Sequence, residues 1–172
     1  MRKTVLLFGL TAGAISVGIM LMTVRYINTA DFGKSDILGY TSIALSALLV
    51  FFGIRSYREN AGGGKLTFGR GFSVGVLISL VSALCYVAAF QILYFKVMPG
   101  LGAQYAACMV ERAKASGGSA QEVEKAIREA AQFKEMFDRP VLNAALTFAE
   151  SFPVGFAVSL LSAAVLRKKG AK

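Results

Sequence analysis

The sequence contains no histidine and no tryptophan, and only two cysteines and three prolines among its 172 residues. Without histidine, the chain lacks the commonest general base and the commonest metal ligand of proteins. The two cysteines, Cys85 and Cys108, lie in an apolar and a polar stretch respectively, so they do not indicate a disulfide framework. The sequence shows no catalytic constellation, cofactor motif or metal-ligand set. We therefore expect no enzymatic activity, no cofactor and no metal.

Charge is also scarce, because charged residues make up 17% of the chain, against 55% for apolar residues. Soluble domains typically contain about 25% charged residues. The apolar excess is concentrated in four stretches, at about 4–24, 37–54, 72–95 and 141–166. A helix of about 20 mainly apolar residues crosses a bilayer core of about 30 Å. The sequence therefore predicts an all-α membrane protein with four transmembrane helices in a bundle, forming a single domain over 1–172.

The first apolar stretch follows Arg2 and Lys3, as the core of a secretory signal would. It is longer than the usual core of a signal, however. The segment Asn28-Thr29-Ala30 is also a poor cleavage site, because Asn stands where a small residue is required. We therefore interpret this stretch as an uncleaved span.

Basic residues are unevenly distributed among the segments outside the spans. The N-terminal segment, the second connection and the C-terminal tail hold 10 of the 19 Lys and Arg residues, opposed only by Glu59. The first connection is neutral, and the third has seven basic and six acidic residues. Because an excess of Lys and Arg marks cytoplasmic segments, we expect both termini to be cytoplasmic. The net charge of +9 then indicates contact with anionic lipids at that face, and no nucleic-acid binding.

The third connection, at about 96–139, is the longest polar segment. We expect a short helix at Ala103–Ala115, then a second helix that begins at a capping box of Ser119 and Glu122 and ends near Phe137. Three i,i+4 pairs of opposite charge support the second helix: Glu124–Arg128, Lys125–Glu129 and Glu135–Arg139. Two interpretations remain open. The segment is either an amphipathic cover over the bundle or a docking surface for a partner.

Glu150 is the only charged residue within the four apolar stretches. An ionised carboxylate near the bilayer midplane is costly, so we expect Glu150 to face the interior of the bundle. Asn143, Thr147 and Ser151 lie on the same side of the helix and extend a polar stripe from it. Pro153 removes one backbone hydrogen bond and predicts a kink.

Two roles for Glu150 are open. In the structural one, a protonated Glu150 is hydrogen-bonded to Tyr86 or Ser46, and the protein has a non-enzymatic structural or interaction role, binding a protein or lipid. In the alternative, Glu150 is the titrating group of a small proton- or cation-linked transporter or ion pathway.

Small residues recur at four-residue spacing in the spans. Gly9 and Gly13 form one such pair, and Gly71 and Gly75 form another. Glycines at this spacing allow the backbones of two helices to approach closely. We expect these pairs to pack the helices of the bundle, and a homo-oligomer or a membrane-protein partner is an alternative use of the same surfaces.

Several stretches across nearly the whole chain resemble a family of four-span bacterial membrane proteins, domain of unknown function 4199. The resemblance lies in Gly39-Tyr40-Thr41, Phe51-Phe52-Gly53-Ile54-Arg55, Leu66-Thr67-Phe68-Gly69, Gly75-x-x-Ile78-Ser79-Leu80, Glu150-Ser151-Phe152-Pro153-Val154-Gly155 and Ser159-Leu160. It implies a four-helix protein of the bacterial cytoplasmic (inner) membrane. It implies no activity and no catalytic residue.

Overall fold

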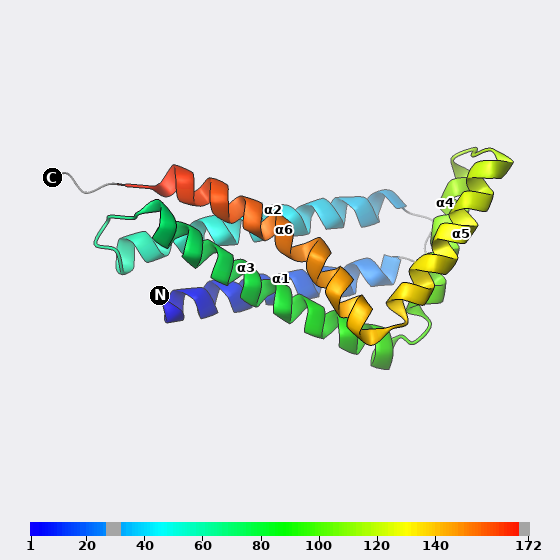
Figure 1. Ribbon diagram of the computed structural model, residues 1–172, viewed down its shortest axis with the longest axis horizontal. Coiled ribbons are helices and arrows are strands. Elements are labelled where there is room, and N and C mark those ends of the chain that lie inside the picture. Colours follow the sequence, from blue (N-terminus) through cyan, green and yellow to red (C-terminus); the bar gives the residue numbers. More distant parts are fainter. Residues whose placement is uncertain (27–31, 169–172) are drawn as a thin grey trace.

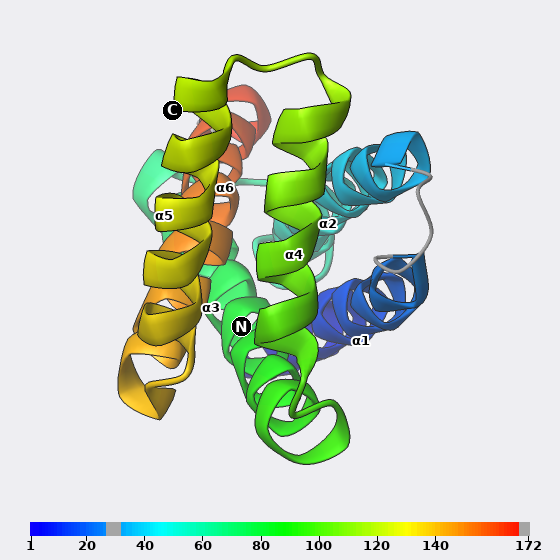
Figure 2. The same cartoon turned by 90° about the vertical axis from the view of Figure 1, so that its right-hand side faces the viewer.

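The structure is a computed structural model that describes residues 1–26 and 32–168, with the side chains of 25–40 and 43 left out of the description. Within these ranges the chain is helical and contains no β-strand. The elements are α1 (Arg2–Tyr26), α2 (Phe32–Asn60), α3 (Phe68–Ile92), a π-helical turn η1 (Leu93–Val97), α4 (Leu101–Ala115), α5 (Ala120–Phe137) and α6 (Pro140–Leu166). Helices α1, α2, α3 and α6 run along the long axis of the molecule, and α4 and α5 form a hairpin across one end (Figures 1 and 2).

Within the described part of the chain, three segments are long and apolar enough to cross a membrane, namely Arg2–Val24, Phe68–Val97 and Pro140–Leu166. Their outward faces carry large apolar side chains, with Leu7 65% and Val165 75% exposed, as a lipid-facing surface requires. The protein is thus a helical membrane protein. Helix α2 contains the predicted second span, but part of that span and the first connection lie outside the residues whose side chains are described. The fourth crossing therefore stays a prediction.

The helices extend beyond the apolar stretches because polar residues cap and continue them. Helix α2 runs on to Asn60 through an exposed turn in which Arg55 Nε donates to Glu59 Oε1 at 2.9 Å. This hydrogen bond from Arg55 holds the pKa of the Glu59 carboxyl below its usual value. Helix α3 begins four residues before the apolar stretch, because Thr67 Oγ1 accepts the backbone N–H of Arg70 at 3.4 Å.

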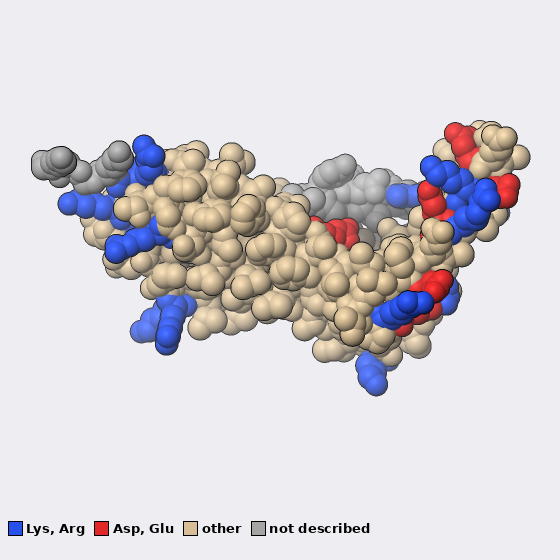
Figure 3. All heavy atoms as spheres, in the orientation of Figure 1, with Lys and Arg blue, Asp and Glu red and all other residues tan. Residues whose placement is uncertain are grey.

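One end of the molecule is basic. The start of α1, the α2–α3 turn and the end of α6 lie together there, and Figure 3 shows Lys and Arg gathered on that side, whereas the hairpin carries both signs of charge. Leu66 in the turn exchanges two backbone hydrogen bonds with Lys168, of 3.1 and 3.0 Å. This bridge ties the turn to the residues after α6. We call this side the basic end and the opposite side the hairpin end.

Helix α3 is central, since it packs extensively against both α1 and α6. Near the basic end, the side chains of Ile54, Val74 and Ile78 are fully buried between α2, α3 and α6. We call the cluster to which they belong the basic-end core: Val5, Val50, Ile54, Leu66, Val74, Ile78 and Leu166.

The hairpin follows the sequence prediction closely. The capping box is confirmed, because Ser119 Oγ accepts from the Glu122 backbone and the Glu122 carboxylate accepts from Ser119. All three predicted ion pairs on α5 are confirmed, with the Arg139–Glu135 pair the shortest at 2.7 Å. Helix α4 begins at Leu101, two residues before the predicted start.

Candidate functional site: a cavity between the spans

A cavity of about 650 Å³ lies between α1, α2, α3 and α6, in the half of the molecule nearer the hairpin. Helices α2 and α6 diverge toward this end, and the hairpin lies across it (Figures 1 and 2). Leu101, Gly102 and Tyr105 of α4 and Phe133 and Phe137 of α5 contribute to the lining. The cavity is thus built by the spans and covered by the hairpin.

Hydroxyl groups line the cavity from all four long helices. Two hydroxyl pairs link neighbouring helices near its deep end. Ser16 of α1 lies 3.3 Å from Ser46 of α2, and Ser79 of α3 lies 3.3 Å from Ser159 of α6, oxygen to oxygen. The other lining hydroxyls are those of Thr23, Ser42, Ser82, Thr147 and Ser151. The surface of the cavity is therefore weakly polar, with donors and acceptors but few charges.

Aromatic rings line the part of the cavity nearer the hairpin. Tyr86, Phe90 and Tyr94 stand on successive turns of α3 and η1, with ring centroids 6.4 and 5.9 Å apart along the series. From the hairpin, Tyr105 stacks on Phe133 with ring centroids at 4.9 Å. The rings form a continuous aromatic wall from mid-span to the hairpin.

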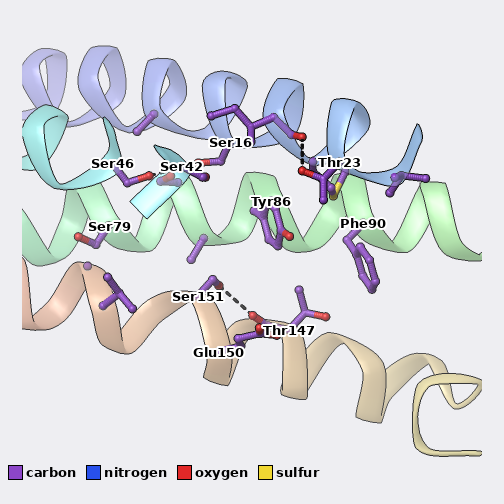
Figure 4. Close-up of a pocket in the computed structure, with 18 of the residues that line it drawn as sticks. Ser16, Thr23, Ser42, Ser46, Ser79, Tyr86, Phe90, Thr147, Glu150 and Ser151 are labelled. Carbon is purple, nitrogen blue, oxygen red and sulfur yellow. Dashed lines mark hydrogen bonds between the residues drawn. The ribbon is translucent and has the colours of Figure 1, made fainter. Parts of the chain in front are cut away.

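Glu150 lines the cavity from α6. It lies ten residues after the first residue of the helix, about 15 Å along it and so near the middle of a span. Its side chain is exposed, and among the described residues none forms a hydrogen bond or ion pair with its carboxylate. Figure 4 shows Tyr86 pointing from α3 toward α6, on the side where Thr147, Glu150 and Ser151 lie.

The structure brings several of the predicted residues to this cavity. Tyr86, Thr147 and Ser151 line it together with Glu150. Neither Tyr86 nor Ser46 is hydrogen-bonded to Glu150, and Ser46 is instead paired with Ser16 as described above. Glu150 therefore lines the cavity with an exposed side chain, and neither of its predicted bonding partners is hydrogen-bonded to it.

Asn143 and Pro153 lie in α6 but do not belong to the lining. Asn143 is fully buried, and its amide oxygen accepts from Gln91 Nε2 at 3.0 Å. Its amide nitrogen donates to the Phe137 carbonyl at 2.9 Å. Asn143 thus joins α3, α6 and the end of α5, which is a structural role.

The four glycines singled out in the sequence lie at helix–helix contacts within the chain. A Cβ at Gly9 or Gly13 would meet Val81 or Cys85 across the α1–α3 contact. On α3, Gly71 lies against Ala163, and a Cβ at Gly75 would lie 2.8 Å from the Ser159 hydroxyl. The close approach of α3 to both neighbours depends on these positions.

Sequence reasoning missed the contacts that attach the hairpin. Tyr94 Oη donates to Asp138 Oδ1 at 2.8 Å, and Lys134 Nζ donates to Asp138 Oδ2 at 2.6 Å. Hydrogen bonds from Lys134 and then Tyr94 hold the pKa of the Asp138 carboxyl below its usual value. Gly102 packs on the same Tyr94 hydroxyl, where a Cβ would overlap it. A tyrosine at the end of a span indicates in the sequence that its hydroxyl forms a hydrogen bond, but it does not indicate which residue is the partner.

Comparison with protein families matches residues 7–168 to the model of a family described as "Protein of unknown function (DUF4199)". The chain belongs to the DUF4199 family. This match confirms the resemblance found in the sequence. No curated protein and no solved structure matches this DUF4199 chain. The cavity and its residues are therefore the basis for any functional conclusion.

Proposed function

We propose that this DUF4199 protein is a non-enzymatic membrane protein that binds an amphiphilic molecule, such as a lipid, in the cavity between its spans. The cavity carries the proposal. At about 650 Å³ it falls within the range of about 300–1,000 Å³ usual for ligand sites, and it combines an aromatic wall with scattered hydroxyls and one carboxylate. An apolar surface with a few convergent polar groups suits a ligand that has an apolar body and a polar head.

The divergence of α2 and α6 gives such a ligand a route from the lipid phase. These two helices meet near the basic end, where Val158 of α6 packs on the core that contains Val50 and Ile54 of α2. Toward the hairpin the two helices separate (Figure 1), and we propose that the ligand enters from the lipid between them. A molecule that partitions into the bilayer reaches the cavity sideways, without crossing the aqueous phase.

The absence of tryptophan allows a single introduced fluorophore to report on the cavity. Phe90→Trp places an indole in the lining, and Ile92→Trp, two residues along α3 and 59% exposed, places one toward the lipid at nearly the same depth. Each variant is reconstituted in nanodiscs and titrated with three amphiphiles whose acyl chains carry two bromine atoms: one neutral, one cationic and one anionic. We expect at least one amphiphile to quench the tryptophan fluorescence of the Phe90→Trp variant saturably. The same amphiphile should quench the fluorescence of the Ile92→Trp variant only in proportion to its concentration in the lipid.

A filled cavity provides the matched control. Ala47 lines the cavity from α2, whereas Ala44 on the same helix is exposed. Combined with Phe90→Trp, Ala47→Phe should abolish the saturable quenching and Ala44→Phe should preserve it. Proportional quenching of the Phe90→Trp variant by all three probes, with no saturable phase, contradicts the proposal.

The second candidate is the small proton- or cation-linked transporter. The observation that favours it is the Glu150 carboxylate, which lines the cavity at mid-span without a bonding partner among the described residues. Glu150→Gln should abolish proton-coupled flux in proteoliposomes while the protein remains folded. Loss of folded protein in place of loss of flux supports a structural role.

We propose further that the protein lies in the bacterial cytoplasmic (inner) membrane with the basic end in the cytoplasm, in contact with anionic lipids, and that it crosses the membrane four times. The support is the concentration of Lys and Arg at that end (Figure 3). Cys108 of α4 should then react with an impermeant maleimide added to intact spheroplasts, and Cys85 within α3 should not. Labelling of Cys108 only after lysis reverses the orientation. A homo-oligomer or membrane-protein partner is also open, and crosslinking in native membranes tests it.

A further inference from the structure

We infer that the ligand of the cavity is a monovalent organic cation with an apolar body, such as a hydrophobic amine or a quaternary ammonium ion, whose charge lies beside Glu150. The inference rests on the proposed binding function and names the chemical class of the ligand. Three features carry it: the sign of the charge in the cavity, the character of its walls, and its size.

The charge in the cavity indicates the sign of the charge on the ligand. Among the described residues that line the cavity, Glu150 alone carries a charge, and neither Lys nor Arg is present. An ionised carboxylate at mid-span is costly until a counter-ion arrives, and none of the residues that the structure describes pairs with Glu150. A cation neutralises it, whereas an anion placed in the same cavity would add a second unsolvated negative charge.

The walls favour an organic cation over a metal ion. Calcium takes six to eight oxygen ligands and magnesium takes six, usually including carboxylates. Within the described part of the chain, no three His, Cys, Asp or Glu residues lie close enough together to hold a metal. A cavity of about 650 Å³ is also far larger than a bare ion, and most of its extra space is bounded by apolar side chains.

The aromatic wall suits a cation whose charge is spread over alkyl or aryl groups. The faces of Tyr and Phe rings attract cations within about 6 Å, and this attraction is stronger where water is excluded. Tyr86 and Phe90 lie on α3 opposite Glu150, and Tyr105 and Phe133 extend the rings to the hairpin. A cation held beside Glu150 thus has aromatic rings in the same cavity to contact its apolar groups.

Besides Glu150, the titratable groups that line the cavity are the phenols of Tyr86, Tyr94 and Tyr105, while the described lining of α1 and α2 supplies only hydroxyls and apolar groups. Phenols are neutral at ordinary pH, so they do not change the charge of the site.

Two ions of the same shape and opposite charge test the sign of the charge that the cavity accepts. Tetraphenylphosphonium and tetraphenylborate are each used to displace the brominated probe that quenches the Phe90→Trp variant. We expect tetraphenylphosphonium to displace the probe and tetraphenylborate not to displace it. The Ile92→Trp variant corrects for partitioning of each ion into the lipid.

Substitution of the carboxyl localises the charge. Glu150→Gln should raise the Kd of tetraphenylphosphonium at least tenfold, whereas Glu150→Asp, which keeps the charge, should raise it less. Glu124→Gln on the exposed face of α5 removes one negative charge as well and should leave this Kd unchanged. Because the comparison of the two ions needs no substitution at Glu150, it remains decisive if Glu150→Gln fails to fold.

The outcomes separate the two proposals. Equal displacement by both ions, or displacement by tetraphenylborate alone, overturns the inference and leaves the binding function standing. An unchanged Kd in folded Glu150→Gln also overturns it. If none of the brominated probes quenches the Phe90→Trp variant saturably, the proposed function and the inference fall together.

Discussion

The two halves of the molecule, built by the same four long helices, differ in how they pack. Toward the basic end, α2, α3 and α6 enclose fully buried side chains such as Ile54, Val74 and Ile78. Toward the hairpin end, α2 and α6 separate around a cavity of about 650 Å³, and the hairpin lies over it.

Small residues explain the difference. Gly75 lets Ser159 and Ile54 approach α3, and Gly155 packs against Ser79, so α3 and α6 are in close contact on the basic-end side. On the other side of this contact, α3 presents the large rings of Tyr86, Phe90 and Tyr94 to the cavity. The half toward the basic end, which we call the sealed half, is therefore closely packed at glycine and serine. The half toward the hairpin, which we call the cavity half, has room for a ligand.

The largest expected effect is that of Gly75→Leu in the sealed half. A Cβ at this position would already lie 2.8 Å from Ile54 Cδ1 and from Ser159 Oγ, so a leucine forces α3 and α6 apart. We expect loss of the folded monodisperse protein in size-exclusion chromatography. Gly18→Leu on α1 is the control, because nothing lies within 4 Å of its Cβ position. Equal behaviour of the two variants would contradict the close packing of the sealed half.

Ile54→Ala should have the next largest effect. Its side chain is fully buried in the basic-end core, so truncation leaves a cavity and should lower the free energy of unfolding by about 2–4 kcal/mol. Unfolding in mixed micelles measures this change. Leu48→Ala on the same helix, 50% exposed, should cost much less. A loss at Leu48 as large as that at Ile54 would place the core on the wrong face of α2.

Asp138→Asn should loosen the hairpin without unfolding the spans. The substitution weakens the hydrogen bond from Lys134 and alters that from Tyr94, so hydrogen exchange in α4 and α5 should accelerate while that in α3 and α6 stays slow. The expected effect is small, because the carboxylate is about half exposed and solvent screens it. Glu129→Gln, elsewhere on α5, is the control.

Acid pH should mimic this substitution. The pKa of Asp138 is lower in the folded state than in the unfolded chain, where it is about 4. Its contribution is therefore fully present above about pH 4 and is lost as the pH falls through the lower folded value. The rate of hydrogen exchange in α4 and α5 should rise in that pH range in the wild-type protein, but not in the Asp138→Asn variant. A rise of the same size in both would assign the effect to another group.

The smallest effect on stability is expected for Ala47→Phe in the cavity half. Its side chain points into free space, so a larger ring should change the free energy of unfolding by less than about 1.5 kcal/mol in mixed micelles. Destabilisation comparable to that of Ile54→Ala would mean that the cavity is filled by packed side chains, and that the two halves do not differ.

Much of the fold follows from local sequence. The apolar stretches specify where the long helices lie, because backbone groups in lipid must be satisfied within each helix. The capping box at Ser119 and the ion pairs of α5 involve residues three or four apart, so they were predictable one by one. The glycine pairs indicated that helices approach closely. They did not indicate which helices do so, for example that Gly9 of α1 lies against Val81 of α3.

The candidate site was only partly predictable. Glu150 was recognisable from the sequence by itself, because a carboxylate within an apolar stretch is costly wherever that stretch lies. The periodicity of α6 also grouped it with Thr147 and Ser151. The aromatic wall was not predictable, since it combines residues from α3 with Tyr105 and Phe133 of the hairpin, and nothing local relates these positions.

The sequence by itself thus determined the membrane class, the helices, the basic end and the one residue whose charge needs an explanation. Tertiary structure alone decided that Asn143 is bonded within the fold while Glu150 faces a cavity, although both lie on one stripe of α6. The physical reason is that α3 approaches α6 at Gln91 and supplies an amide there, whereas α2 and α6 diverge beside Glu150. Which neighbour a polar side chain meets depends on how the helices are spaced, and that spacing is a property of the whole bundle.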